Sequence, residues 1–340
     1  MMKEFIKKLT NRENLAPYEM REAMLNIMEG KATPSQIGAF LVALKMKGES
    51  VEEITEAAKV MREKALKVEV NREDGLVDTC GTGGDGKNTF NVSTVSAFVV
   101  AGAGIKVAKH GNRGVSSGCG SADVLEELGI RLDLTPEQVA RCIEEIGIGF
   151  LFAPSFHPAM KYATPVRREL GMRSIFNILG PLSNPAFANI QILGVYSAHL
   201  IKPIIQVLKN LGHLGAMVVH AKDGYDEITL TGPTLVAEYR EGEIKEYELT
   251  PEELGFNKCL PEEISVMDKM ENTRVLRGIL DDKIKDAKRD MVLINSGATI
   301  YLTGKAKNLK EGIEFAREVI LSGKGKEKLD ALIEYTRSFS

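Results

Sequence analysis

The sequence predicts a protein of two parts, a small all-helical domain followed by a larger α/β domain with a mainly parallel sheet. Three observations predict this fold class. The first 70 residues place apolar side chains at helical spacing, and from Leu76 onward short apolar runs alternate with glycine-rich turns and helical patterns. The chain has 340 residues, more than the roughly 250–300 at which a single hydrophobic core stops growing.

The composition is that of a packed globular protein. Hydrophobic residues make up 44% of the chain and charged residues 27%, which excludes global disorder. Lys plus Arg number 44 and Asp plus Glu number 47, so the net charge is −3. This balance creates no overall field that would attract nucleic acid or an acidic membrane surface.

Targeting and redox features indicate a cytoplasmic protein. No apolar run approaches the roughly 18 consecutive residues of a membrane span, so we expect no transmembrane helix. The charged start of the chain does not resemble a secretory signal. Four cysteines occur without a Cys-x-x-Cys pair, which fits neither a disulfide framework nor a zinc site.

The first 70 residues are expected to form the helical domain. Its predicted helices are Tyr18–Glu29, Pro34–Lys45 and Val51–Ala65. Thr33 before a proline and Ser50 with a carboxylate three residues later have the patterns of helix N-caps.

The α/β domain is predicted from the alternation of strands and helices. The candidate strands are Leu76–Thr79, Ile105–Ala108, Ile148–Phe152, Ile190–Val195 and Ala216–His220. The candidate helices are Ser93–Gly102, Ser121–Leu128, Pro136–Glu145, Pro158–Leu170 and Ala198–Leu211. Thr234–Arg240 and Ile244–Leu249 are expected to pair antiparallel, with three or more helices after them.

A glycine-rich segment, residues 80–94, follows the first candidate strand and leads into a helix. Glycines allow backbone amides to approach a ligand closely, and a helix N-terminus favours phosphate. The segment matches G-x-G-x-x-G, but no acidic residue lies between Asp85 and Asp123 to bind a ribose, so a dinucleotide site is disfavoured. Asn88 stands where a Walker A loop needs Ser or Thr. A plain strand-to-helix turn would explain the glycines only.

A second cluster, residues 109–121, again follows a strand and precedes a helix. It combines two cations and a histidine with three serines and four glycines, which describes a cradle for an anion. Two such loops at the carboxyl ends of neighbouring strands lie where open α/β sheets bind ligands, and together they indicate a ligand with two phosphate centres. The alternative for this loop is a solvated basic turn.

Two further segments carry weaker patterns. The adjacent carboxylates Asp226 and Glu227 follow a strand and are more often a solvated turn, but they would suit magnesium if they faced the phosphate loops. The segment 157–169 has the pattern of a basic helix with His157 near its start and Arg167 further along. No nucleophile with an evident base emerges, since Cys119 lies in a glycine loop without one.

These four segments together resemble the anthranilate phosphoribosyltransferase family over nearly the whole chain. Four features carry the resemblance, namely the motif Gly-Thr-Gly-Gly-Asp at 81–85, the motif Lys-His-Gly-Asn-Arg at 109–113, Arg167 and the stretch 177–185. It implies transfer of the phosphoribosyl group of 5-phosphoribosyl 1-diphosphate to the amine of anthranilate, with release of pyrophosphate, in the second step of tryptophan biosynthesis from chorismate. The related pyrimidine nucleoside phosphorylases and a non-catalytic, nucleic-acid-binding relative remain alternatives.

The resemblance also implies an architecture. The helical domain would comprise residues 1–70 with a returning segment near 174–188, and the α/β domain residues 71–173 and 189–340. The family dimerises through its helical part, so a homodimer is expected, with only small-molecule substrates as further partners. Met160 departs from relatives that carry an aromatic residue there, which leaves the shape of the aromatic pocket open.

Site residues are carried over from the resemblance by motif. Phosphoribosyl diphosphate would be held by Gly81, Gly84, Asp85, Thr89, Asn91, Val92, Ser93, Thr94, Lys109, His110, Gly111, Asn112, Arg113, Gly114, Val115, Ser116, Ser117 and Ser121. Anthranilate would be held by Gly81, His110, Asn112, His157, Arg167 and Gly180. Magnesium, expected as two ions per subunit, would be held by Ser93, Asp226 and Glu227. No acid or base is assigned, and Lys109 is the candidate for stabilising the charge of the leaving group.

Overall fold

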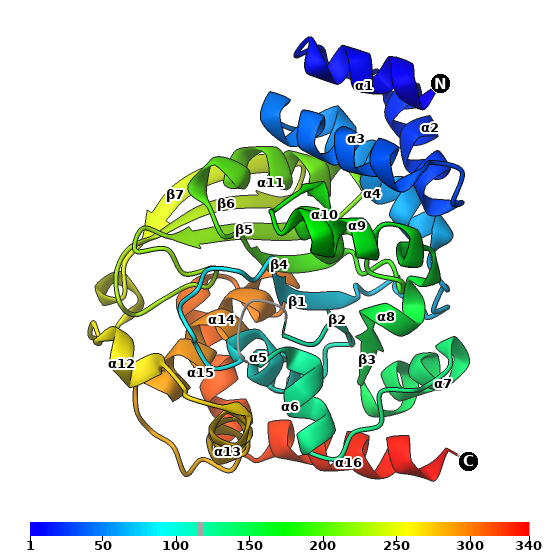
Figure 1. Cartoon of the computed structure of the whole chain (residues 1–340). Helices are drawn as coiled ribbons and strands as arrows, with labels where there is room; N and C mark the ends of the chain where they lie inside the picture. Colours follow the sequence, from blue (N-terminus) through cyan, green and yellow to red (C-terminus); the bar gives the residue numbers. More distant parts are fainter. Residues whose placement is uncertain (115–118, 340) are drawn as a thin grey trace.

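A computed structural model describes residues 1–114 and 119–339 and has the predicted fold class (Figure 1). Four helices come first, namely α1 (Met2–Thr10), α2 (Pro17–Met28), α3 (Pro34–Lys47) and α4 (Val51–Lys64). The periodicity predicted the last three of them. The additional helix α1 buries Met2, Phe5 and Leu9, whose spacing of three and four residues places them on one helical face.

The two predicted N-caps are confirmed. The Thr33 hydroxyl accepts a hydrogen bond from the Gln36 amide at 3.3 Å, and the Ser50 hydroxyl accepts one from the Glu53 amide at 3.2 Å. Each cap satisfies a backbone donor that the first turn of the helix leaves free. These side chains therefore fix where α3 and α4 begin.

One mixed sheet of seven strands forms the centre of the molecule, in the order β3-β2-β1-β4-β5-β6-β7. The strands are β1 (Val77–Gly81), β2 (Val107–Gly111), β3 (Ile148–Phe152), β4 (Ile190–Gly194), β5 (Gly215–Ala221), β6 (Thr234–Arg240) and β7 (Glu243–Leu249). The pairs among β1 to β5 are parallel, and β5-β6 and β6-β7 are antiparallel. The predicted strands and the predicted antiparallel pair are confirmed, with ends that shift by at most a few residues.

The helices that follow α4 connect and cover these strands, and one of them, α10, packs on the helical part. They are α5 (Val92–Gly102), α6 (Ser121–Glu127), α7 (Pro136–Arg141), α8 (Ala153–Phe156), α9 (Thr164–Leu170), α10 (Ile175–Leu182), α11 (Ile201–Asn210), α12 (Pro261–Ile264), α13 (Lys269–Leu280), α14 (Ala287–Leu302), α15 (Leu309–Leu321) and α16 (Lys324–Ser338). A π turn at Cys142–Ile146 and 3₁₀ turns at Pro158–Tyr162, Ala198–Leu200 and Glu252–Leu254 complete the set.

The continuous helix predicted over Pro158–Leu170 is wrong. A 3₁₀ turn occupies Pro158–Tyr162, and α9 starts at Thr164 with Pro165 in its first turn. Proline has no backbone N–H and disfavours helical geometry in the residue before it, so Pro165 fits only the start of a helix. Pro203 acts in the same way in the predicted helix Ala198–Leu211, where the α-helix itself begins at Ile201.

The apolar side chains form two clusters, one on each side of the sheet. One cluster joins the strands to α5, α14, α15 and α16. The other joins α1 to α4, α10 and α11 to the opposite face of the sheet, where Leu193, Val195 and Val218 contribute. The helical part is therefore packed on the sheet itself, and α10 lies against α3 and α4 although it is distant from them in the sequence.

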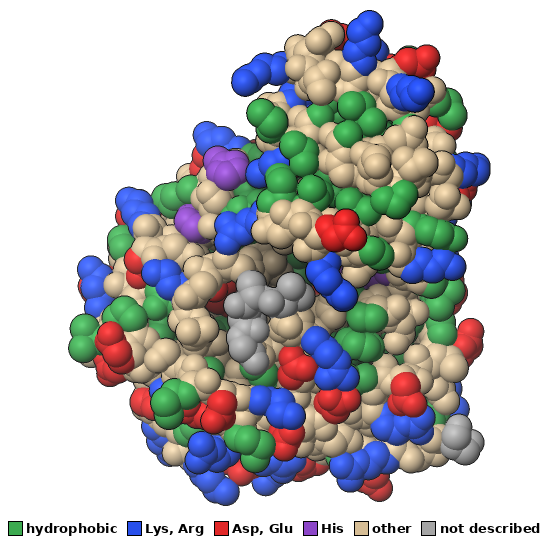
Figure 2. Space-filling model, in the orientation of Figure 1, with side chains coloured by type: hydrophobic (Ala, Val, Ile, Leu, Met, Phe, Trp, Pro, Cys, Tyr) green, Lys and Arg blue, Asp and Glu red, His purple; other side chains and the backbone are tan. Residues whose placement is uncertain are grey.

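The surface agrees with the charge balance. Figure 2 shows basic and acidic side chains interspersed over the lower part of one face, without a stripe of a single sign there. Among the described residues, no helix is long and apolar enough to cross a bilayer.

Within the helical part, Glu53 is a fully buried carboxylate. It accepts hydrogen bonds from the backbone amides of Leu15 at 2.9 Å and Ser50 at 2.8 Å and pairs with the ammonium of Lys47 at 2.7 Å, whose side chain is 3% exposed. This carboxylate thus joins the segment before α2, the end of α3 and the start of α4.

Replacing Glu53 with alanine is expected to destabilise the fold by about 3–5 kcal/mol, because it leaves the buried Lys47 charge and two buried amides without their partner. The matched control is Lys59→Ala, which breaks an exposed pair with Glu56 and should cost less than about 1 kcal/mol. Urea unfolding followed by circular dichroism measures both. Equal, small losses in the two variants would contradict the assigned role of Glu53.

Candidate functional site

The carboxyl ends of the parallel strands meet at one edge of the sheet, and the loops that leave them form the candidate site. The loop after β1 runs from residue 82 to 91 and enters α5, and the loop after β2 precedes α6 (Figure 1). The turn with the two acidic residues follows β5. Because β1 lies between β2 and β4, the glycine loop is central among these segments.

The glycine loop adopts a backbone that needs its glycines. Gly83, Gly84 and Gly86 have φ values of 63°, 78° and 73°, in the left-handed region that other residues rarely adopt. Asp85 is half-buried between them, and its carboxylate accepts a hydrogen bond from the Lys87 amide at 3.1 Å. The loop therefore presents backbone amides where a residue with a side chain would be strained.

The start of α5 carries hydroxyl groups that no described protein group satisfies. Asn91 is the residue before the helix, Val92 is buried, and the hydroxyls of Thr89 and Thr94 are buried without a hydrogen-bond partner among the described residues. Ser93 is half-buried beside them. Buried polar groups normally have partners, so these hydroxyls indicate a place for a polar ligand.

Two glycines allow the acidic turn to approach the glycine loop. A Cβ atom on Gly81 would lie 2.4 Å from a carboxylate oxygen of Asp226, and one on Gly194 would lie 1.5 Å from its backbone oxygen. The same carboxylate accepts a hydrogen bond from the Gly83 amide at 2.9 Å. Asp226 therefore faces the glycine loop, as the magnesium prediction requires.

Three carboxylates come close together at this point. Burial and the nearby charge of Asp85 raise the pKa of Asp226 to about 7, and burial and Asp226 raise that of Glu227 well above its usual value. Carboxylates held together in this way favour a divalent cation. No set of three His, Cys, Asp or Glu side chains in the described ranges could hold a metal alone. The residues fit magnesium, which takes few protein carboxylates and completes its shell with water and phosphate.

Lys109 is buried on β2 beside the same loops. Its ammonium donates hydrogen bonds to the Thr79 carbonyl at 2.6 Å and to the Ser93 hydroxyl at 3.3 Å. Burial lowers the pKa of Lys109, while the charges of Asp78 and Glu227 raise it. A cation is thus held under the start of α5, next to the acidic pair.

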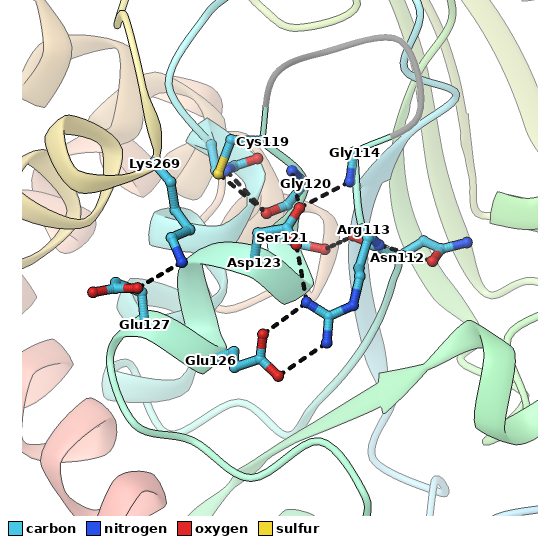
Figure 3. A network of polar contacts seen from close by, with 11 residues as sticks. Asn112, Arg113, Gly114, Cys119, Gly120, Ser121, Asp123, Glu126, Glu127 and Lys269 are labelled. Carbon is cyan, nitrogen blue, oxygen red and sulfur yellow. Dashed lines mark hydrogen bonds and ion pairs between the residues drawn. The ribbon is translucent and has the colours of Figure 1, made fainter.

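The second loop is closed by a carboxylate. Asp123 in α6 accepts hydrogen bonds from the amides of Gly114 at 2.9 Å and Gly120 at 2.8 Å (Figure 3). A Cβ atom on Gly111 would lie 2.2 Å from the hydroxyl oxygen of Ser121, so only glycine fits there. The predicted ligands Val115, Ser116 and Ser117 lie outside the described residues.

Arg113 and Asn112 are exposed at the start of this loop. The guanidinium of Arg113 contacts Glu126 through two hydrogen bonds of 2.7 and 2.9 Å and Asp123 through one of 3.1 Å (Figure 3). Its charge is therefore paired in this structure, and it would have to exchange these carboxylates to contact a phosphate. The Asn112 side chain accepts a hydrogen bond from the Arg113 amide at 2.8 Å.

His110 and His157, which are distant in sequence, lie side by side with ring centroids 5.2 Å apart. Burial lowers the pKa of His110 to about 3 and that of His157 to about 4, so both rings are neutral near pH 7. The His110 ring lies beside the backbone of Gly180 and the His157 ring beside that of Ser183, and each ring has a buried Nε2 without a partner among the described residues.

Arg167 of α9 is a cation beside α10, the helix that contains Gly180. It is half-buried, lies 5.3 Å from the ring centre of Phe176, and has no carboxylate within ion-pair distance in the part of the chain that the structure describes. A Cβ atom on Gly180 would meet open space. Both features suit a small aromatic carboxylate lying beside the histidines.

Sequence reasoning missed three residues here. Arg173, between α9 and α10, donates a hydrogen bond to the Gly84 carbonyl and lies 4.2 Å from the ring centre of Tyr196. Asp78 and Asn184 are buried and hydrogen-bonded to each other at 2.9 Å. An acidic residue inside an apolar strand was the available indication for Asp78, whereas the other two depend on contacts between distant segments.

Two family models match most of the chain. The α/β domain of a glycosyl transferase family matches residues 73–326, and the helical bundle domain of a glycosyl transferase family matches residues 3–65.

Curated relatives match along their full length. The anthranilate phosphoribosyltransferase of Persephonella marina is 52% identical over 337 residues, covering 99% of each chain. That of Acetivibrio thermocellus is 53% identical over 339 residues, covering 100% of this chain and 98% of the relative.

Solved structures agree with this match. Anthranilate phosphoribosyltransferase from Thermus thermophilus superposes with a TM-score of 0.93 at 43% identity, covering 98% of this chain and 99% of that one. The Saccharomyces cerevisiae enzyme in complex with PRPP and Mg has a TM-score of 0.89 at 29% identity, covering 99% and 98%. The fold, the family models and these full-length identities agree, and the chain belongs to the anthranilate phosphoribosyltransferase family.

Proposed function

We propose that the chain transfers the phosphoribosyl group of 5-phosphoribosyl 1-diphosphate to the amine of anthranilate, giving N-(5-phosphoribosyl)anthranilate and pyrophosphate. This is the second step of tryptophan biosynthesis from chorismate. The observation that carries the proposal is the match of at least 52% identity to relatives of this name over 99% of the chain or more. The geometry supports it, because the loops suited to phosphate lie at one edge of the sheet, and Arg167, near Phe176 of α10, has no ion-pair partner among the described residues.

The two loops after β1 and β2 bind the phosphoribosyl diphosphate in this proposal. The glycine backbone of the first loop is suited to phosphate oxygens, as are the hydroxyls of Thr89 and Thr94, which have no partner among the described residues. The residues that bind the phosphates are those predicted from the sequence. Arg113 contacts a phosphate only after its ion pairs with Asp123 and Glu126 break.

In this proposal each subunit binds two magnesium ions, and the residues that hold them are Ser93, Asp226 and Glu227. The support is the cluster of raised-pKa carboxylates beside the glycine loop. When bound, magnesium would neutralise negative charge on the diphosphate. Yeast enzyme structures with PRPP and Mg, and with 4-fluoroanthranilate, support this use of the metal and of these substrates.

The protein's own contribution to the reaction is positioning and electrostatics. Lys109 places a buried positive charge beside Ser93, where it stabilises the departing pyrophosphate. Arg167 binds the carboxylate of anthranilate, and the neutral rings of His110 and His157 pack beside the substrate with Gly81, Asn112 and Gly180 nearby. The amine is then oriented toward the ribose carbon that loses pyrophosphate, and no covalent intermediate with the protein is needed.

Assembly and location form part of the same proposal. The chain acts as a cytoplasmic homodimer joined through the helical domain, which comprises residues 1–70 and the returning segment 174–188. Residues 71–173 and 189–340 form the α/β domain. The packing of α10 on α3 and α4 supports this division, and light scattering after size-exclusion chromatography measures the dimer.

Anthranilate fluorescence is expected to disappear when the protein meets both substrates with magnesium, and to persist when phosphoribosyl diphosphate or magnesium is left out. The physical reason is that the reaction attaches the ribose to the amine that is conjugated with the aromatic ring, and this changes the fluorescence of the ring. The decrease of fluorescence over time, recorded in a fluorimeter with purified protein, measures the loss. Persistent fluorescence with a folded protein would contradict the proposed reaction.

Arg167→Ala is expected to raise KM for anthranilate about 10- to 100-fold, since a charge-assisted hydrogen bond contributes about 1.5–3 kcal/mol. KM for phosphoribosyl diphosphate should change little. Arg168→Ala, which alters the exposed neighbour, is the control and should leave both constants unchanged. Equal losses for both substrates in the Arg167 variant would remove it from the anthranilate site.

Asp226→Asn together with Glu227→Gln is expected to raise the magnesium concentration for half-maximal rate at least about tenfold, because the two carboxylates are the charged ligands in the proposed set. The rate is measured during a magnesium titration. Asp223→Asn, an exposed carboxylate of the same turn, is the control. An unchanged titration in the double variant would exclude these residues as metal ligands.

A further inference from the structure

Asp78 is a buried carboxylate that the proposed reaction does not use. It lies on β1 with 0% of its surface exposed. One carboxylate oxygen accepts a hydrogen bond from the backbone amide of His110 at 3.1 Å, and the other accepts one from the side-chain amide of Asn184 at 2.9 Å. Asp78 thus holds the backbone of β2 at the residue after Lys109.

Asn184 links the same carboxylate to the segment that leaves α10. Its side-chain nitrogen also donates to the Ala108 carbonyl at 2.8 Å, and its oxygen accepts from the Ala186 amide at 2.9 Å. Both hydrogens of the amide are therefore used, one on Asp78 and one on Ala108. The pair joins β1, β2 and the end of α10 through interior hydrogen bonds.

Further polar groups fix this end of α10. Gln191 on β4 donates to the Pro181 carbonyl at 2.8 Å and contacts the thiol of Cys80 at 3.1 Å, and that thiol lies 3.7 Å from Asp78. The rings of His110 and His157 lie beside the backbone of Gly180 and Ser183. A network of buried side chains on three strands thus ends on residues 180–184.

Stability alone does not account for this arrangement. The nearby Lys109 ammonium donates its hydrogen bonds to Thr79 and Ser93, and burial raises the pKa of Asp78 to about 6 despite the charge of Lys109. Burying a carboxylate without a paired cation costs free energy that an apolar residue at this position would not require. Its hydrogen bonds do, however, fix the separation between β2 and α10.

We propose that Asp78 and Asn184 form a positioning pair, which sets Lys109 and His110 on β2 at a fixed place relative to Gly180 and the end of α10. This inference rests on the proposed function, in which the β2 side binds the diphosphate and the α10 side binds anthranilate. The pair acts through these residues without contacting substrate. It holds the two substrates in the relative placement that bond formation needs, where a shift of about 1 Å can cost about 100-fold in rate.

Kinetics of Asp78→Asn and Asn184→Ala test the proposal. Each variant is expected to lower kcat at least about tenfold while both KM values stay within about threefold, because misplacement affects the transition state more than binding. The reversed pair, Asp78→Asn with Asn184→Asp, restores the contact between one carboxylate and one amide, although residue 184 then no longer donates to the Ala108 carbonyl. It is expected to recover at least about threefold of the kcat lost in Asp78→Asn.

A matched control is Asn189→Ala. The Asn189 side chain accepts a hydrogen bond from the Leu76 amide at 2.8 Å and so also anchors β1, but at the opposite, amino end of the strand. It should lower stability without lowering kcat. Melting temperatures of all variants separate folding from turnover, and Asn184→Ala carries the kinetic test if Asp78→Asn does not fold.

A spectroscopic measurement tests the positioning without any substrate. The chain has five histidines, so selective ¹⁵N-histidine labelling gives five backbone amide signals, and His110→Gln identifies the one of interest. Loss of the carboxylate in Asp78→Asn is expected to move that signal, while the other signals stay in place. An unmoved His110 signal, or an unchanged kcat in folded variants, would overturn the proposal. No turnover by the unaltered chain would instead overturn the proposed function, and the amide signal would still decide the positioning.

Discussion

The parallel pairing of β1 with β2 on one side and β4 on the other is the constraint on which the site depends. Residue by residue, Cys80 pairs with Leu193 and Gly81 with Gly194, so the strands end together. Two glycines at this end leave room for Asp226, which could not approach the loop past a side chain. The acidic turn, the glycine loop and Lys109 therefore converge because one register brings three strand ends to the same edge.

The same edge collects polar groups that the protein does not satisfy by itself. Hydroxyls of Thr89 and Thr94 and the Nε2 atoms of two histidines are buried without partners in the described ranges, and the acidic pair is held close to Asp85. Folding around such groups costs free energy, and a bound ligand that supplies the missing partners recovers it. The site is thus arranged for a charged ligand before that ligand arrives, which is the condition for electrostatic catalysis.

The fold could be predicted from the sequence because parallel strands are short apolar runs, and the loops could be predicted because glycines and charges are contiguous there. The error at Pro158–Leu170 arose because the periodicity continues through Pro165 although the backbone does not. Asp78, Asn184 and Arg173 could not be assigned, since their roles depend on partners 32, 106 and 89 residues away. The nucleoside phosphorylase and nucleic-acid-binding alternatives were open for a related reason, because shared loops do not distinguish relatives, whereas full-length identity does.

The end of α10 is where the two halves of the proposed site meet the helical part. Arg62 of α4, itself buried, donates a hydrogen bond to the Leu182 carbonyl at 2.7 Å. The next residue is Ser183, whose backbone lies beside the His157 ring. Asn184, two residues after Leu182, then binds the sheet. Residues 180–184 therefore form one of the contacts between the helical part and the sheet, beside the packing of α4 on α11. This short segment is hydrogen-bonded to α4 on one side and to β1 on the other, which leaves it few alternative positions. The same contacts therefore fix the proposed anthranilate side of the site and the packing of the helical part.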